Sequence, residues 1–297
     1  MERPVFVLCP PDHFTVSYVI NPWMDPDDWA RNRDEYERAA RDGWQALADA
    51  LKDAGAEIHI LAARPGVPDL VFTANIASVI DGKAMLARFR HPERRAEEPL
   101  IAAFFAELER RGIVHEIRTP PQGETFEGAG DAILDEARGV IWMGHGPRTS
   151  PGMARVLEDY YDLPVIPLKL VDPRFYHLDT CFCPLSGGEV IWFPAALDAA
   201  SAAELRRRVP ADKRIAIEED NATLLAANAV CIGRKVIAGD MTGDLRKELG
   251  QRGYEVALPR IGAFARSGGS AYCLTLRLDR TSARDAAKAR PATLAHS

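Results

Sequence analysis

Residues 76–89 read IASVIDGKAMLARF, and this stretch decides the fold. Apolar and β-branched residues stand on both sides of Asp81-Gly82, a pair that is typical of a tight hairpin turn. The stretch therefore predicts two strands joined at that turn. A helical pattern follows over about residues 93–111, and a further strand, IVHEI, covers residues 113–117. The predicted unit is thus strand, strand, helix, strand.

The same order of elements recurs three more times along the chain. The turns inside these units are expected at Arg138-Gly139, Gly187-Gly188 and Gly233-Arg234. One of the helices should begin with Ser150 as N-cap and Pro151 as its first residue, a strong start signal. The other two helices are expected over residues 201–209 and 243–252, and a strand closes each unit.

A fifth unit is divided between the two ends of the chain. The N-terminal part supplies the strand VFVLCP, one long helix over residues 27–53 with Asp25 as N-cap, and the strand EIHIL. The C-terminal part supplies the strand CLTLRL, residues 273–278. Five units of which the last is completed by both termini predict a closed ring without exposed sheet edges. We therefore expect one α/β domain over residues 1–280 and a polar, frayed tail over residues 281–297.

Composition excludes several classes of partner. The chain has 297 residues, 47% hydrophobic and 27% charged, with a formal net charge of -6, which gives no electrostatic reason to expect nucleic acid or an anionic membrane. The clusters Arg94-Arg95 and Arg206-Arg207-Arg208 fall in helical patterns and are interpreted as solvated helix faces. There is no long apolar span and no signal-like N-terminus, so a cytoplasmic protein is expected. Five cysteines, an odd and small number, indicate free thiols.

The residues capable of covalent chemistry stand at equivalent places in the units. FTAN, FEGAGD, YHLDT and SGGSAYC each precede or begin the first strand of a unit, and such positions converge on the axis of a ring. Asn75, Glu127, His177, Asp179 and Cys273 are therefore expected to meet. A cysteine that opens a strand is more often a small buried apolar residue than a nucleophile. The glycines just before Cys273 favour the nucleophile, because they allow close approach of a substrate.

Metal binding is the competing interpretation. Cys181 and Cys183 form a C-x-C pair near His177, but no second pair stands at zinc spacing and the segment CFCPL is apolar enough to be core. No phosphate-binding glycine loop is present. The sequence thus predicts neither a metal nor an organic cofactor.

With these motifs in hand, the sequence resembles the guanidine-modifying superfamily of arginine deiminases, dimethylarginine dimethylaminohydrolases and amidinotransferases, over Val5 to about Leu278. The resemblance implies a pseudo-five-fold α/β propeller, the pentein fold, built of ββαβ units. HLDT is similar to the catalytic histidine motif, SGGSAYC to the run before the nucleophilic cysteine, and FEGAGD to a Glu-Gly-Gly-Asp motif with one extra residue. It implies Cys273 as nucleophile, His177 as acid and base, and Glu127 as the third catalytic residue.

The resemblance also implies a substrate pocket. GPRT and RFRHPERR are similar to segments whose arginines contact the substrate carboxylate. The residues implied to bind substrate are Asn21, Asp69, Phe72, Asn75, Arg90, Arg148 and Asp179. Deiminases have an aspartate where FTAN has Asn75, and with INPWMD and HLDTCFCPL this makes the chain most similar to arginine dihydrolases, which convert arginine to ornithine, carbon dioxide and two ammonia.

Three other functions stay open. A dimethylarginine dimethylaminohydrolase or deiminase would use the same site and stop at citrulline, and an amidinotransferase would use an amine in place of water. A binding protein without chemistry is the third, because fold alone does not establish activity. The expected partner in the preferred hypothesis is a small guanidine, arginine or a derivative of it, and a homo-oligomer is compatible with the sequence.

Overall fold

Five small three-stranded sheets, all of one topology, form the framework of the protein. The structure is a computed structural model that describes residues 3–282. In each sheet the first two strands of a unit are antiparallel, and the second strand pairs parallel with the third. The sheets are β3 (Ala77–Ile80), β4 (Lys83–Leu86) and β5 (Glu116–Arg118); β6 (Ala132–Asp135), β7 (Val140–His145) and β8 (Val165–Lys169); β9 (Phe182–Pro184), β10 (Val190–Trp192) and β11 (Arg214–Ala216); β12 (Val230–Ile232), β13 (Lys235–Ile237) and β14 (Glu255–Ala257); and β15 (Leu276–Arg277), β1 (Val5–Leu8) and β2 (Glu57–Ile60).

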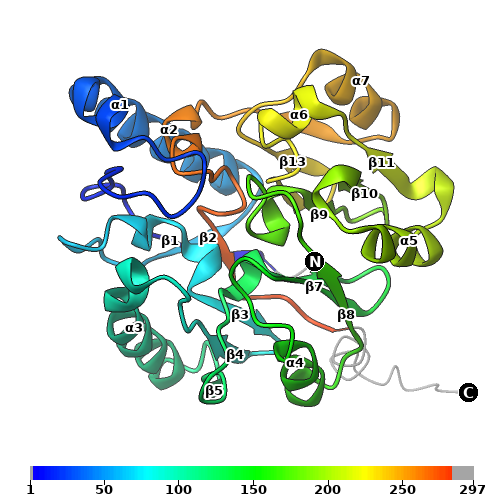
Figure 1. The fold of residues 1–297 in the computed structure, drawn as a ribbon, viewed down its shortest axis with the longest axis horizontal. Helices are drawn as coiled ribbons and strands as arrows, with labels where there is room; N and C mark the ends of the chain where they lie inside the picture. The colour runs from blue at the N-terminus through cyan, green and yellow to red at the C-terminus, as the bar shows by residue number, and fades with distance from the viewer. Residues whose placement is uncertain (1–2, 283–297) are drawn as a thin grey trace, which may run out of the picture.

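The last of these sheets confirms that the termini complete one unit. β15 pairs antiparallel with β1, and β1 pairs parallel with β2. Figure 1 shows the five sheets placed around the centre of the molecule with helices at its periphery, as the pentein fold requires. The described chain continues past the expected boundary at residue 280, since the Ser282 backbone N–H donates to Asp81 at 2.6 Å. The rest of the expected tail, residues 283–297, lies outside the described residues.

Helices connect the second and third strands of the units, as the sequence predicts. They are α1 (Pro26–Arg31) and α2 (Arg33–Asp53), α3 (Glu98–Arg110), α4 (Met153–Tyr161), α5 (Ala199–Arg208) and α7 (Gly243–Gln251), with the short α6 (Glu219–Thr223) and α8 (Gly262–Ala265) elsewhere. Asp25 caps α1 as expected, by accepting from the Asp28 N–H.

Two details of the predicted helices are wrong. The expected single helix over residues 27–53 is broken at Asn32, whose side chain donates to the Asp28 carbonyl and so ends α1. The helix expected at Ser150 begins at Met153, because the Ser150 hydroxyl accepts from the Thr125 N–H and does not cap a helix.

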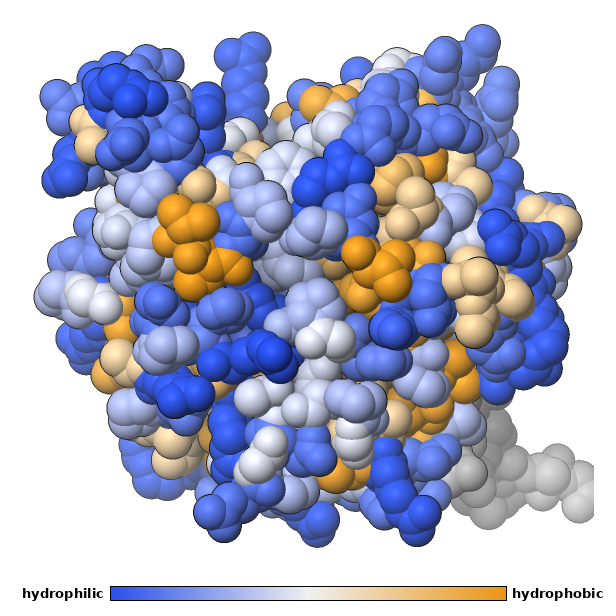
Figure 2. Space-filling model, in the orientation of Figure 1, coloured by the Kyte–Doolittle hydropathy of each residue, from blue (hydrophilic) through white to orange (hydrophobic). Residues whose placement is uncertain are grey.

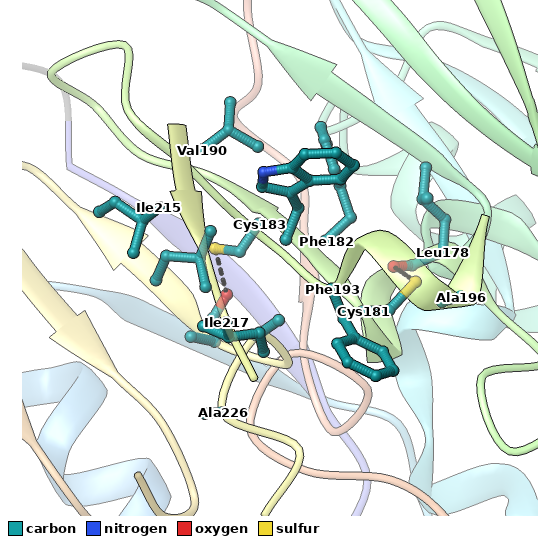
Figure 3. Close-up of a cluster of buried hydrophobic side chains, with 14 of the residues drawn as sticks. Leu178, Cys181, Phe182, Cys183, Val190, Phe193, Ala196, Ile215, Ile217 and Ala226 are labelled. Carbon is teal, nitrogen blue, oxygen red and sulfur yellow. Dashed lines mark hydrogen bonds between the residues drawn. The ribbon is translucent and has the colours of Figure 1, made fainter. Parts of the chain in front are cut away.

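The core is divided among the units. One cluster of buried side chains packs between the second, third and fourth units and includes Cys181 and Cys183. Figure 3 shows their sulfur atoms apart from one another, each joined by a dashed line to an oxygen. Cys181 contacts the Leu178 carbonyl at 3.5 Å and Cys183 the Ala229 carbonyl at 3.2 Å. Both cysteines therefore serve as apolar core residues with a weak S–H donor.

Tight turns precede the first strands of the units. Residues 73–75, 128–130 and 178–180 form short 3₁₀ helices immediately before β3, β6 and β9. Asn75 is thus in a turn, and its strand starts only at Ala77. The prediction that Cys273 opens a strand is wrong, since Cys273 lies in a turn and β15 starts at Leu276. Turns suit these residues because they can direct polar side chains toward the axis.

No helix within residues 3–282 is both long and apolar enough to cross a bilayer. On the face seen in Figure 2, hydrophobic side chains form separate patches among hydrophilic ones.

Candidate active site

A buried histidine that is hydrogen-bonded to a glutamate forms one half of the site. His177 Nε2 lies 2.7 Å from Glu127 Oε2, and the same oxygen accepts from Arg148 Nη1 at 3.0 Å. Burial opposes the charge on Glu127, but Arg148 and His177 outweigh it and hold the pKa of Glu127 well below its usual range. Burial lowers the pKa of His177 to about 4, although Glu127 opposes this. His177 is therefore neutral near pH 7, and its Nε2–H donates to an acceptor-only carboxylate.

The turn that carries Glu127 is held by a second carboxylate. The Glu127 N–H donates to Thr149 Oγ1 at 3.2 Å, and the Thr149 hydroxyl donates to Asp131 Oδ2 at 2.6 Å. Asp131 Oδ1 accepts from the Leu178 N–H next to His177. Gly128 has a φ of +64°, and a Cβ there would lie 2.5 Å from the Ala74 carbonyl oxygen. Only a glycine fits this backbone conformation so close to Ala74, and Glu127, the residue just before it, reaches His177.

The amide of Asn75 contacts the other nitrogen of His177. Arg94 Nη1 donates to Asn75 Oδ1 at 2.8 Å, which fixes the amide nitrogen on the opposite side, where Nδ2 lies 3.4 Å from His177 Nδ1. Because the Nε2–H faces Glu127, His177 Nδ1 is the acceptor in this contact. Nδ1 is accordingly the ring atom that is free to take and return a proton.

The interpretation of Arg94 as part of a solvated helix face is wrong. Arg94 is 2% exposed and makes two hydrogen bonds with Glu97, both of 2.8 Å, in addition to the one with Asn75. Burial raises the pKa of Glu97 to about 7, with Arg94 opposing this rise. The arginine is buried because it joins the Asn75 turn to the segment that leads into α3.

Cys273 faces a carboxylate and an amide. Its Sγ donates to Asp179 Oδ2 at 3.1 Å and accepts from Asn228 Nδ2 at 3.0 Å. Burial raises the pKa of Asp179 to about 7, and burial together with the charge of Asp179 raises the pKa of the Cys273 thiol well above its usual value. The Cys273 thiol is thus protonated near pH 7.

Gly130 marks the space that these groups enclose. A Cβ built on Gly130 would lie 2.5 Å from Asn75 Nδ2, 3.5 Å from His177 Cγ and 3.6 Å from Asp179 Oδ2. Asn75, His177 and Asp179 therefore come together at one point, as the sequence predicts for the axial turns. Asp179 Oδ1 has no hydrogen-bond partner among the described residues although it is buried, so it is available to a ligand with N–H groups.

The remaining candidate residues lie around this centre. Asp69 accepts from the Tyr18 hydroxyl at 2.9 Å, and its Oδ1 is a second buried oxygen without a partner within residues 3–282. Asn21 and Arg148 line a cavity of about 300 Å³ together with Tyr176 and His91. Arg148 joins this cavity to the buried centre through its bond to Glu127.

The Phe72 side chain is buried in an aromatic cluster, whereas the Arg90 side chain is exposed. The Phe72 ring packs edge-on against Phe14 and Phe264 under Gly269, whose Cβ would lie 2.4 Å from that ring. The Arg90 side chain is exposed, and only its backbone N–H reaches the site, where it donates to Glu127 Oε1 at 3.2 Å.

Sequence reasoning missed two members of the site, Arg94 and Asn228. Arg94 is hidden by its place in a charged, helix-like stretch. Asn228 carries a usable signal, since it stands before the first strand of the fourth unit as Asn75 does in the first. A search of every unit for a polar residue at this place would have found it.

Comparisons with known proteins agree with this geometry. A family model described as N,N dimethylarginine dimethylhydrolase, eukaryotic, matches residues 10–280. The bifunctional arginine dihydrolase/ornithine cyclodeaminase ArgZ of Synechocystis is 40% identical over 92% of the chain, and AgrE of Nostoc is likewise 40% identical over 92%. The chain spans only 37% of the length of each of these two relatives.

Solved structures show the same likeness. The N-terminal domain of ArgZ, in a cysteine-to-serine variant bound to its substrate, has a TM-score of 0.86 and 36% identity and covers 94% of this chain and 99% of its own. A dimethylarginine dimethylaminohydrolase adduct has a TM-score of 0.71 at 19% identity, which supports the fold alone.

The pentein fold and its axial cluster of cysteine, histidine and carboxylates define a member of the guanidine-modifying superfamily. Within it, the chain belongs to the family of N,N-dimethylarginine dimethylhydrolases that the matching model describes. The named relatives in this group are hydrolytic enzymes that modify arginine.

Proposed function

We propose that the chain hydrolyses the guanidinium group of arginine to give ornithine, carbon dioxide and two ammonia, with Cys273 as the covalent nucleophile. The observation that carries this proposal is Asn75, a neutral amide held by Arg94 against His177 Nδ1, where a one-step deiminase has an acid. The 40% identity to two enzymes named as arginine dihydrolases supports it.

The guanidinium binds between the axial carboxylates. The unpartnered Asp179 Oδ1 accepts its N–H groups in charge-assisted hydrogen bonds, each contributing about 1.5–3 kcal/mol. The cation also favours the ionised form of Asp179, whose pKa burial has raised. Arg148 and Asn21, with Asp69 and Phe72 on the wall, form the part of the pocket that receives the amino-acid end of the substrate, and the exposed Arg90 side chain stands outside it.

His177 carries the protons in each step of the first hydrolysis. The Cys273 thiol gives its proton to His177 Nδ1, and the sulfur forms a bond with the guanidinium carbon. His177 then protonates the departing nitrogen, which leaves as ammonia and leaves an amidino-thioether on Cys273. Water attacks the same carbon while His177 takes its proton, the C–S bond breaks, and the proton returns to the sulfur. Glu127 keeps the ring oriented throughout.

Asn75 decides whether citrulline leaves at this point. An aspartate holds a cation strongly and a neutral ureido group less well, whereas an amide both donates and accepts. Citrulline therefore stays in the site for a second attack by Cys273 on the ureido carbon. The second hydrolysis consumes one more water and yields ornithine, carbon dioxide and the second ammonia.

The proposal is tested by product stoichiometry. The purified chain is incubated with arginine, and ammonia, citrulline and ornithine are measured to completion. Two ammonia and one ornithine per arginine are expected, and one ammonia with citrulline as the sole product would contradict the second hydrolysis. Loss of turnover in Cys273→Ala tests the nucleophile separately.

The family match favours one second candidate, hydrolysis of dimethylarginine to citrulline. The two candidate functions differ in the substrate that each prefers. Comparing arginine with N,N-dimethylarginine at equal concentration separates the two, since the dihydrolase should prefer the unmethylated guanidinium.

A further inference from the structure

Asn228 is a fully buried amide that lies against the sulfur of Cys273. Its relative exposure is 0%, and it stands just before β12 in the fourth unit. Its backbone N–H donates to the Leu225 carbonyl at 2.9 Å, as the Asn75 N–H donates to the Phe72 carbonyl at 3.0 Å in the first unit. The fourth unit thus sends an amide to the axis from the same kind of turn, but to the cysteine and not to the histidine.

The orientation of this amide is fixed by groups that can only donate. Asn228 Oδ1 accepts from the Ser270 N–H and the Cys273 N–H, both at 3.1 Å. Nδ2 must therefore point to the other side, where it lies 2.9 Å from the Asp179 carbonyl and 3.0 Å from Cys273 Sγ. Both amide hydrogens and both oxygen lone pairs are used, so only one orientation of the side chain satisfies the site.

We infer that Asn228 positions the Cys273 sulfur and stabilises its thiolate by direct N–H donation, which rests on the proposed role of Cys273 as nucleophile. The titratable groups whose charge acts on the sulfur are Asp179, Tyr176 and Tyr272, whereas His177, the proposed proton acceptor, is neutral because its pKa is lowered to about 4. None of these favours a thiolate, since Asp179 opposes it with its own charge when ionised. The Asn228 N–H is the side-chain donor at the sulfur within the described residues, so it compensates part of this cost when the thiol ionises.

Two substitutions separate this role from a structural one. Asn228→Asp keeps an oxygen for the Ser270 and Cys273 N–H groups but replaces the N–H at the sulfur with a negative oxygen, whereas Asn228→Ala removes both. In the full chain without substrate, the rate of Cys273 alkylation by iodoacetamide is followed from pH 6 to 10, with the labelled peptide identified by mass. The measured thiol pKa should rise by about 1 to 2 in Asn228→Ala and by more in Asn228→Asp.

The alkylation rate at pH 7 should fall correspondingly, by roughly 10- to 100-fold, because a smaller fraction of the thiol is ionised. In turnover of arginine, kcat should fall with little change in KM, because Asn228 touches the sulfur and not the pocket. A thiol pKa that is unchanged in the folded Asn228→Asp variant overturns the inference.

Asn221 supplies the matched control. It is also a buried asparagine of the fourth unit, but its amide bonds to Thr242 at the start of α7 and not to the site. Asn221→Ala should lower the melting temperature and leave the thiol pKa unchanged. A rise in thiol pKa in this control as large as in Asn228→Ala would show a general loosening and would also overturn the inference.

If both Asn228 variants fail to fold, the inference is tested on the wild-type protein by NMR. The side-chain amide signals of asparagine, labelled with ¹⁵N, are followed by NMR across the thiol titration. One amide pair should shift with the same midpoint as Cys273 alkylation and should lose that response in Cys273→Ser; no such pair overturns the inference. Failure of the proposed function looks different, because Cys273→Ala would then retain turnover whatever the Asn228 variants do.

Discussion

Asn75 holds Arg94 with its oxygen and His177 with its nitrogen, so one amide joins the buried arginine to the imidazole of His177. Asn75→Asp should change the products of arginine turnover from ornithine toward citrulline. One carboxylate oxygen can keep the bond to Arg94, but the other becomes a charged acceptor that favours the cationic substrate over the neutral intermediate. The ratio of citrulline to ornithine, measured by amino-acid chromatography after complete turnover, checks this.

The control for this change is Asn221→Asp, which alters a buried amide outside the site. It should leave the product ratio as in the wild type. If Asn75→Asp releases ornithine in the wild-type proportion, the amide has no part in retaining citrulline.

Arg94→Met should destabilise the fold strongly. The substitution leaves Glu97 buried without its bidentate partner and Asn75 Oδ1 without its donor. Removal of one member of a buried ion pair costs about 3–5 kcal/mol, which urea unfolding measures directly. The double variant Arg94→Met/Glu97→Leu should regain most of that stability, because the uncompensated charge is gone.

Product analysis of the double variant separates stability from chemistry. Asn75 stays without its donor there, so the fraction of arginine that reaches ornithine should fall even in a stable protein. If the double variant is as unstable as the single variant, the uncompensated charge of Glu97 is not the cause of the lost stability.

The repeats could be read from the sequence because each hairpin has a local turn signal. Asp81-Gly82 and Arg138-Gly139 lie in the turns where strand patterns predict them, and the unit divided between the termini follows from counting strands. The axial placement of Asn75, Glu127, His177 and Asp179 followed from that same register.

The sequence could not predict which residues from different units form hydrogen bonds and ion pairs with one another. Arg94 looks like a surface charge because only the folded chain places Glu97 and Asn75 beside it. Cys273 looks like the start of a strand because leucine occupies every second position of CLTLRL, which is a strand pattern. The bonds of Asn228 to the Ser270 and Cys273 N–H groups instead hold Cys273 in a turn. Long-range hydrogen bonds override local propensity at both places.

Asp179→Asn should change how stability depends on pH. The pKa of Asp179 is raised to about 7 in the folded chain, so the folded state keeps a proton that the unfolded state loses near pH 4, and this contribution to stability is lost as pH rises toward 7. His177, with its pKa lowered to about 4, has the opposite sign, because the unfolded state gains a proton below about pH 6.5. The two contributions oppose each other between pH 4 and 7.

Removing the Asp179 carboxylate leaves the His177 contribution alone. The free energy of unfolding of Asp179→Asn, relative to the wild type, should therefore increase with pH over this window, by at most about 1.4 kcal/mol per pH unit. Urea titrations at pH 5, 6 and 7 measure it. A difference that is constant over the three pH values would place the Asp179 pKa outside this range.

Gly130→Ala should abolish most of the activity and leave the fold intact. The added Cβ would lie 2.5 Å from Asn75 Nδ2, nearer than a Cβ can approach, so Asn75 must move away from His177 and from the space in which we propose that the guanidinium binds. Misplacement of a group by about 1 Å can cost on the order of 100-fold in rate. Gly250→Ala, on the exposed side of α7 with nothing near its Cβ, is the matched control and should keep full activity with slightly higher stability. Steady-state kinetics with arginine and thermal unfolding of both variants check the pair, and wild-type turnover by Gly130→Ala would mean that the axial space is larger than these contacts allow.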